Sequence, residues 1–245
     1  MAQFRERMPA RYIHTRRPLL DTLLTCWKEW GGRHKPVIGV VDYDNLPTIH
    51  EFELVRQYFE SQGYHTVVSD PRKLVYDGEG LYAGGTKIDL VYRRVLVNEF
   101  LERYDQVKAL HLAVKDRKIC MVNPFRSKLV HKKGIFAVLT SDGRDEWLSP
   151  GNRELIDRAV PWTRVLEAGK TNFLGRTIDL LPWIATNKDE LVIKPNDEYG
   201  GKGVMLGWET ETSAWEAQIH AAVSGQDRFV VQKRLHMVPE QFPSL

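Results

Sequence analysis

The stretch ELVIKPNDEYGGKGVMLGWE, residues 190–209, carries the most informative pattern in this chain. An apolar run ends in Lys194 and Pro195, and a second lysine, Lys202, follows among glycines. The chain then turns apolar again, so the stretch predicts two strands joined by a glycine-rich loop. Such a loop is either an ordinary hairpin turn or a cradle for an anion, and the surrounding sequence has to decide between these interpretations.

The residue types in this loop suit the binding of phosphate. Glycine tolerates positive φ and close approach, so that consecutive N–H groups of Gly200, Gly201 and Gly203 can converge on an anion. Val192 and Lys194 lie on the same side of the predicted strand, because side chains alternate along a strand. From there the lysine can act as a point charge on phosphate oxygens.

Two common phosphate-binding motifs are excluded. A Walker A motif is absent, because no glycine lies five residues before Lys202 and Gly203 occupies the position that requires Ser or Thr. A dinucleotide fingerprint is absent too, since no GxGxxG opens a helix after a strand. Asp197 and Glu198 also belong to the loop and would repel phosphate unless their side chains point away.

The first 120 or so residues alternate between strand-like and helix-like patterns, which predicts an α/β layer on a parallel sheet with right-handed connections. Thr48 is expected to cap one helix, with Glu51 in the capping-box position. Helices are expected over 18–30, 49–63 and 98–116, strands over 35–44, 64–71, 88–95 and 118–124, and a hairpin from residue 74.

The pattern changes after Pro124, and we place a domain boundary near residues 120–125. A helix is expected over 127–141, with Leu129, Ile135, Phe136 and Leu139 as core candidates. Strand-like runs at 190–195, 202–209 and 228–235 then enclose an amphipathic helix over 213–225, a compact α+β order.

Composition limits the classes of function. The 245 residues carry a net charge of +3, which gives little reason to expect binding of nucleic acid or of a membrane surface. No apolar run is long enough for a transmembrane helix, and the basic N-terminal arm lacks the apolar core of a secretory signal. Cys26 and Cys120 follow no metal spacing, so we expect two reduced thiols in a cytoplasmic protein and no metal ligands.

The order of these pieces resembles the ATP-grasp superfamily. An apolar strand ending in Lys-Pro, a glycine loop and a return strand are preceded by a lysine-bearing helix and followed by a hinge-like run, FVVQKRL. The chain is more specifically similar to circularly permuted ATP-grasp proteins related to glutathionylspermidine synthase. The phrases IDLVYRRVLVNEF, NPFRSKLVHKKGIFAVL, VPWTRVL and VIKPNDEYGGKGV carry this resemblance across most of residues 35–235.

The resemblance implies a fold and a set of nucleotide-binding residues. After the arm and helix of residues 1–34, it implies a pre-ATP-grasp α/β domain over 35–122 and an incomplete ATP-grasp (α+β) domain over 123–245. Lys194 and Lys133, with Lys132 as the second choice, would hold the ATP phosphates from opposite sides. The remaining implied contacts are the loop residues Tyr199, Gly200, Gly201, Lys202 and Gly203 and the hinge residues Gln232, Lys233 and Leu235.

Two pairs of charged residues follow strands in the predicted α/β domain. Arg93 and Arg94 are candidates for catalysis, as ligands of a substrate carboxylate or a phosphate, and the alternative is a surface pair on an edge strand. Asp42 and Asp44 end the first strand, where open α/β sheets usually place ligands, and the alternative is a pair that caps a turn.

The function implied by the resemblance is the ATP-binding portion of a carboxylate–amine ligase, acting on small-molecule or peptide substrates through an acyl phosphate. Mg²⁺ is expected only with a downstream lobe that this chain lacks. We therefore expect a shortened chain that does not catalyse ligation alone. The alternatives are a non-catalytic nucleotide- or peptide-binding module and a structural or assembly partner.

Overall fold

The computed structural model describes residues 15–44, 47 and 49–236. The chain divides into two compact units, unit 1 over Met1–Phe125 and unit 2 over Arg126–Leu245, and each is described by itself. The predicted N-terminal arm, the Thr48 helix cap and the C-terminal segment 237–245 lie outside the described residues.

Unit 1 is built on a four-stranded parallel sheet with the strand order β2-β1-β6-β7. Ile38 pairs with Thr66 on one side and with Leu90 on the other, so the first strand lies inside the sheet. β6 is also an inner strand, which contradicts the edge-strand alternative for Arg93 and Arg94. The strands are β1 (Ile38–Val41), β2 (Thr66–Ser69), β6 (Leu90–Arg93) and β7 (Cys120–Val122).

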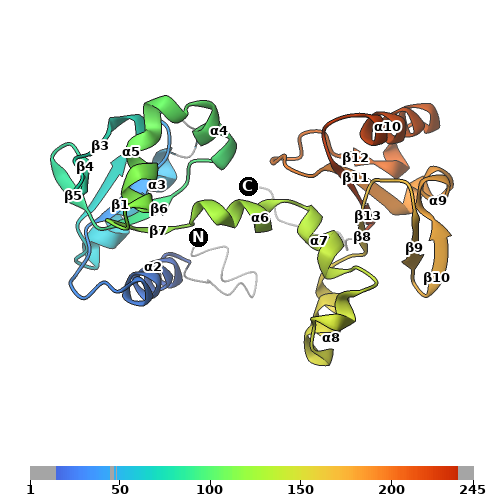
Figure 1. The fold of residues 1–245 in the computed structure, drawn as a ribbon, viewed down its shortest axis with the longest axis horizontal. Coiled ribbons are helices and arrows are strands. Elements are labelled where there is room, and N and C mark those ends of the chain that lie inside the picture. The colour runs from blue at the N-terminus through green and yellow to red at the C-terminus, as the bar shows by residue number, and fades with distance from the viewer. Residues whose placement is uncertain (1–14, 45–46, 48, 237–245) are drawn as a thin grey trace, which may run out of the picture. The chain divides into compact units, whose positions relative to one another are not determined.

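Helices cover both faces of this sheet (Figure 1). Ile38 and Val40 face α2 (Arg16–Trp30) and α3 (Ile49–Ser61), whereas Val41 and Val91 face α4 (Val97–Glu102) and α5 (Tyr104–Lys115). The strands are therefore apolar on both sides, as their continuous apolar sequence predicts. A three-stranded antiparallel sheet, β3 (Leu74–Tyr76), β4 (Leu81–Ala83) and β5 (Thr86–Ile88), packs against α5.

Several predicted boundaries in unit 1 need correction. The single helix expected over 98–116 is two helices, because the chain departs from helical geometry at Arg103. The strand expected over 88–95 is shorter, since Ile88 belongs to β5.

The two free cysteines lie side by side despite their sequence separation, with Cys120 Sγ 3.8 Å from the carbonyl oxygen of Cys26. Burial raises the pKa of the Cys120 thiol to about 11.

Unit 2 is built on a four-stranded antiparallel sheet with the order β12-β11-β13-β8. Leu191, Ile193 and Val231 on one face pack against α9 and α10 around the buried Trp215 (Figure 1). The elements are β8 (Thr163–Val165), β11 (Leu191–Pro195), β12 (Met205–Leu206), β13 (Phe229–Lys233), α9 (Leu180–Thr186) and α10 (Thr212–Ser224). A hairpin of β9 (Lys170–Phe173) and β10 (Arg176–Asp179) precedes α9.

The segment of the sequence from α6 to β10 differs most from the sequence prediction. The helix expected over 127–141 is broken into α6 (Lys128–His131) and α7 (Gly134–Leu139), with Lys132 in extended geometry between them. Leu129 is 73% exposed and Phe136 is 38% exposed, so neither is the core residue that was predicted. α8 (Pro150–Ala159) follows, and β8, β9 and β10 were not predicted.

The predicted fold class is confirmed: a parallel-sheet α/β unit is followed by a unit of mixed helices and antiparallel strands. Within the described ranges, every helix is too short or too polar to cross a membrane.

Candidate functional site

Lys194 lies near the end of β11, on the face of the sheet opposite the core. Leu191 and Ile193 point into the core, and the alternation of the strand turns Lys194 to the other side. Its ammonium donates a hydrogen bond of 2.6 Å to Gln232 Oε1, and no acidic group within the described residues is near enough to form an ion pair. Burial lowers the pKa of Lys194, and the neighbouring charge of Lys133 lowers it further.

Gln232 connects Lys194 to a buried polar chain beneath the site. The side chain of Gln232 accepts from Lys194, and its Nε2 donates to Thr163 Oγ1 at 2.9 Å. The backbone N–H of Thr163 donates to Thr140 Oγ1 at 3.1 Å, and that hydroxyl donates back to the carbonyl of Thr163 at 3.0 Å. The orientation of the Gln232 amide is therefore fixed, with its oxygen toward the lysine.

Lys133 reaches the same site from the start of α7. Its ammonium donates to the carbonyl of Glu198, and its backbone N–H donates to the carbonyl of Asn196 at 2.9 Å. The Asn196 side chain also accepts from the N–H of Gly134 at 2.8 Å. These bonds attach the beginning of α7 to the end of β11 and bring the two predicted phosphate-binding lysines together.

The glycine loop needs its glycines for conformational reasons. Gly200, Gly201 and Gly203 have φ values of 62°, 79° and 69°, which L-residues with side chains rarely adopt. No heavy atom lies within 4 Å of an added Cβ at Gly200 or Gly201. At Gly200 and Gly201 a side chain would therefore have room, and it is the positive φ that requires glycine. Tyr199 and Lys202 are exposed beside them.

Basic side chains bind the two acidic groups of the loop. Asp197 forms a short ion pair with Lys128 and lies 3.8 Å from both Lys132 Nζ and His131 Nε2. Glu198 pairs with Lys202 at 3.3 Å. Basic side chains of residues 128–132 and the loop residue Lys202 therefore balance the negative charges of the loop, which removes the electrostatic objection to phosphate binding raised by its sequence.

The predicted hinge lies where β13 ends. The N–H of Lys233 donates to the carbonyl of Trp162 at 2.9 Å, and Leu235 is exposed. Arg234 donates its N–H to the carbonyl of Glu190 at 2.7 Å and stacks its guanidinium 3.8 Å from the centre of the Trp208 ring. The hinge is thus held by backbone bonds, and Gln232 is the one predicted hinge residue whose side chain reaches Lys194.

Arg93 in unit 1 is buried at the end of β6, with only 7% of its surface exposed. Its guanidinium donates to the carbonyl of Asn123 at 2.9 Å and, through a shorter bond, to the carbonyl of Val95. Burial lowers the pKa of Arg93. This geometry ties together the ends of β6 and β7 and gives Arg93 a structural role in addition to the catalytic role predicted for it.

Arg94 is more accessible than Arg93. It donates to Tyr92 Oη at 3.3 Å, lies 3.5 Å from a carboxylate oxygen of Glu51 and passes over the ring of Phe52. Its long and solvent-exposed ion pair is of a kind that contributes little stability. Arg94 is therefore the better placed of the two arginines to meet a carboxylate or phosphate.

The two aspartates after β1 have different partners. Asp44 forms an ion pair with Lys73 at 2.5 Å, so its carboxylate has a role in holding the local structure. The Asp42 carboxylate accepts a hydrogen bond of 2.9 Å from the N–H of Tyr43, and burial raises its pKa. Asp70, which sequence reasoning missed, accepts from the N–H of Asp44 and binds Arg72 with a fully buried side chain.

The residues that assemble the unit 2 site were only partly predictable. Asn196, Asp197 and Thr163 were not singled out as contributors. Asn196 accepts from the N–H of Lys133 and Thr163 accepts from Gln232, whereas Asp197 pairs with Lys128, which was not a predicted site residue. Asn196 and Asp197 had a weak signal, since both belong to the loop between the strands. Thr163 had none, because its bond to Gln232 spans 69 residues.

In the part of the chain that the structure describes, no three His, Cys, Asp or Glu side chains gather in a way that suits a metal ion. The two lysines instead fit a polyanion such as the phosphates of ATP, because they are cations with neutral partners.

Comparison with known proteins places the fold. No protein-family model and no curated protein matches the chain significantly. A glutathione synthetase-like effector from Globodera pallida is similar over 90% of this chain and 46% of its own, with a TM-score of 0.53 and 14% identity. Over most of its length, the chain thus shares its fold with a glutathione synthetase-like protein.

Two further structures show weaker similarity. The D-cycloserine synthetase DcsG matches over 81% of this chain and 59% of its own, at a TM-score of 0.44 and 16% identity. A RimK domain protein with an ATP-grasp fold from Sphaerobacter thermophilus matches over 82% and 64%, at 0.42 and 18%. This chain spans less than two thirds of each of the three structures.

Proposed function

We propose that unit 2 binds the phosphates of ATP between Lys133 and Lys194. The observation that carries this proposal is the arrangement of these two ammonium groups. They are partly buried and close enough for the charge of Lys133 to lower the pKa of Lys194, yet among the residues that the structure describes each binds only a neutral oxygen. Two partly desolvated cations without an acid are unfavourable alone and favourable around a polyanion.

The other residues of the site have supporting roles in this proposal. Residues 199–203 close over the phosphates, with the N–H groups of their glycines as hydrogen-bond donors. Gln232 orients the Lys194 ammonium, and the backbone near Lys233 and Leu235 meets the adenine. The pairing of Asp197 with Lys128 keeps negative charge away from the phosphates.

We further propose that the chain is the ATP-binding portion of a cytoplasmic carboxylate–amine ligase of the circularly permuted, glutathionylspermidine synthase-like type. The substrate carboxylate takes the γ-phosphoryl group of ATP, which forms an acyl phosphate and releases ADP. An amine then attacks the acyl carbon, which forms the amide and releases phosphate. In unit 1, the pre-ATP-grasp domain of this proposal, Arg94 binds the substrate carboxylate and Arg93 holds the neighbouring strand ends. The described residues contribute no Mg²⁺ site, so no step is assigned to a metal here.

Thermal unfolding of the whole chain with and without millimolar ATP tests the nucleotide site. ATP should raise the melting temperature, and Lys194→Ala should remove most of the rise by weakening binding about tenfold to a hundredfold. Lys108→Ala removes an exposed lysine of unit 1 and is the matched control. An absent ATP effect, or an equal effect in Lys194→Ala, would contradict the site and favour a structural or assembly partner.

ADP release separates a ligase from a non-catalytic module. The full-length product of the gene that encodes this chain is incubated with ATP and Mg²⁺ and with mixtures of amino acids or short peptides, since this chain is not expected to catalyse ligation alone. Substrate-dependent ADP release that is lost in Arg94→Ala supports the ligase. Binding of ATP without such release favours a nucleotide-binding module.

A further inference from the structure

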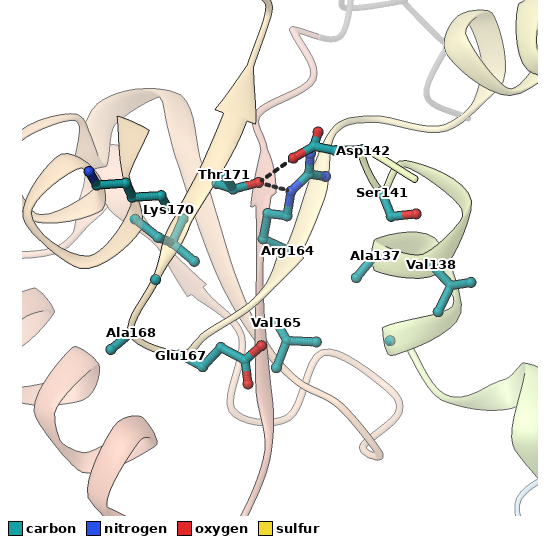
Figure 2. A pocket seen from close by; sticks show the side chains of 13 residues that line it. Ala137, Val138, Ser141, Asp142, Arg164, Val165, Glu167, Ala168, Lys170 and Thr171 are labelled. Atoms are coloured by element: carbon teal, nitrogen blue, oxygen red, sulfur yellow. Dashed lines mark hydrogen bonds and ion pairs between the residues drawn. The ribbon is translucent and has the colours of Figure 1, made fainter. Parts of the chain in front are cut away.

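The cavity of unit 2 between α7, β8 and the turn into β9 favours no single class of ligand (Figure 2). Its volume is about 350 Å³. Two cations, Arg164 and Lys170, and two acids, Asp142 and Glu167, belong to its lining, and Arg164 binds Asp142 at 3.0 Å. Since its charges balance, this cavity selects neither an anion nor a cation.

Unit 1 holds a pair of groups with a defined chemistry, the thiols of Cys26 and Cys120. They are the only two cysteines of the 245 residues, and 94 positions separate them in the sequence. The fold brings them together because α2 packs against β7 (Figure 1). Cys120 Sγ lies 3.8 Å from the carbonyl oxygen of Cys26, and the Cys26 thiol is near enough to oppose the ionisation of Cys120.

The sulfur of Cys120 lies within reach of the Cys26 side chain. A carbonyl oxygen is about 2.4 Å from the Cα of its own residue, so the Cys120 sulfur is at most about 6.2 Å from the Cα of Cys26. Disulfides join residues whose Cα atoms lie about 4.4–6.8 Å apart. The movement needed to join the sulfurs is therefore a rotation of the two side chains with a small shift of α2, and the pairing of the sheet is kept.

The two thiols differ in accessibility, which gives each a separate role. Cys26 is partly exposed, whereas Cys120 is only 4% exposed. Burial raises the pKa of the Cys120 thiol to about 11, so little of it is thiolate at neutral pH. A reagent in solution therefore meets Cys26 first, and Cys120 reacts second and more slowly, from inside the fold.

We propose that Cys26 and Cys120 form a reversible disulfide when a small disulfide such as oxidised glutathione accumulates. The Cys26 thiolate attacks one sulfur of oxidised glutathione, which forms a mixed disulfide and releases one glutathione thiolate. The Cys120 thiolate then attacks the Cys26 sulfur, which forms the internal disulfide and releases the second glutathione thiolate. The two protons of the protein thiols pass through water to the two glutathione thiolates. The protein thiols are thus oxidised, and the glutathione disulfide is reduced.

The disulfide fastens α2 to β7, which is an edge strand of the parallel sheet. Because 94 positions separate the two cysteines, it closes a long loop, lowers the entropy of the unfolded chain and stabilises unit 1. In reducing surroundings both thiols stay free, which is the state expected from the sequence. The stability of unit 1 therefore follows the thiol–disulfide balance around it, independently of the proposed nucleotide site.

Incubation of the whole folded chain with oxidised glutathione, followed by alkylation and mass spectrometry of non-reduced peptides, tests the proposal. The unaltered chain should lose two hydrogens, yield a peptide that joins Cys26 to Cys120, and keep no glutathione. The melting temperature of unit 1 should rise by about 5–15 °C, and dithiothreitol should reverse the rise.

Single variants separate the two steps of the reaction. Cys120→Ala should stop at a lasting glutathione adduct of Cys26. Cys26→Ala should react roughly tenfold more slowly, because its remaining thiol is buried. An unaltered chain that stays reduced, keeps a lasting glutathione adduct, or forms disulfides only between two copies would overturn the proposal.

Discussion

Arg93 in unit 1 and Lys194 in unit 2 are both cations at the ends of inner strands, and burial lowers the pKa of both. They differ in their partners. Arg93 is almost fully enclosed and binds two backbone carbonyls that join β6 to β7. Lys194 remains reachable, binds one amide oxygen and faces a second lysine. A buried cation that its own chain surrounds is structural, whereas one left with a single neutral partner beside a like charge is the kind of group on which the proposed phosphate site is built.

The largest effect is expected from Arg93→Met. The substitution leaves the carbonyls of Val95 and Asn123 without their donor in a buried place, so it should lower the stability of unit 1 by about 3 kcal/mol. Amide hydrogen exchange of β1 and β6 measures this loss separately from unit 2. Arg33→Met, at an exposed position, should change stability by less than about 0.5 kcal/mol. If Arg93→Met lowers the stability of unit 1 only slightly, Arg93 is not required for the structure and stays a candidate for catalysis, so the contrast with Lys194 would be wrong.

The aspartates of unit 1 should show the same contrast as a function of pH. Burial opposes ionisation of Asp70, but bonds from Arg72 and the N–H of Asp44 outweigh it and lower its pKa to about 2. Its stabilising contribution is therefore complete above the ordinary value of 3.8 and is lost as the pH falls toward 2. Asp70→Asn should cost about 2 kcal/mol at pH 7 and flatten this acid dependence.

Asp42→Asn is the control for Asp70→Asn. Burial raises the pKa of Asp42, so its ionised form is unfavourable in the folded state above that pKa. Replacement by asparagine should be neutral or stabilising at pH 7. Hydrogen exchange of β1 at several pH values measures the stability of unit 1 in both variants. A loss of stability in Asp42→Asn would show that the groups around the ionised Asp42 carboxylate stabilise it more than burial destabilises it.

Gln232→Leu should have an intermediate effect that depends on Lys194. The change removes the acceptor of the Lys194 ammonium and should cost about 2 kcal/mol in unit 2. In a Lys194→Met background the same change should cost much less, because no buried cation then needs an acceptor. A double-mutant cycle from urea unfolding, followed by the fluorescence of buried tryptophan, gives the coupling. If the stability changes of Gln232→Leu and Lys194→Met are additive, the two side chains do not interact measurably.

Lys194→Met alone should have the smallest effect on stability, and its sign should be opposite to that of Arg93→Met. A lysine whose folded-state pKa lies below its ordinary 10.5 destabilises the fold at neutral pH, and stability rises as the pH approaches 10.5. The variant should therefore be neutral or stabilised by up to about 1 kcal/mol at pH 7 and lack this alkaline rise. A clear loss of stability would make Lys194 structural, like Arg93.

The sequence predicted the layers of the fold because local patterns carry them. Continuous apolar strands indicated a sheet covered on both faces, and the helices around it were found from their periodicity. The helix expected over 127–141 failed for a long-range reason. Asn196 binds the N–H groups of Gly134 and, through its carbonyl, Lys133, and these bonds compete with helical geometry from more than 60 residues away.

The site was predictable in its cations and unpredictable in their partners. Lys133, Lys194 and the glycine loop were named from spacing and from the resemblance, and the structure brings them together. Their ligand-binding roles remain predictions. The different positions of Arg93 and Arg94 were not foreseen, because two adjacent arginines look alike in sequence and only the burial of one tells them apart.

The attachment of α7 to the end of β11 has a consequence for the rate at which a ligand is captured. Lys133 is bonded at its backbone to Asn196 and at its ammonium to Glu198, so the lysine and the base of the loop move as one body. Only the tip, residues 199–203, retains exposed glycine backbone. At the proposed phosphate site, an incoming polyanion would therefore meet charges already in place and have a short segment to order, which favours fast association and a small entropic penalty.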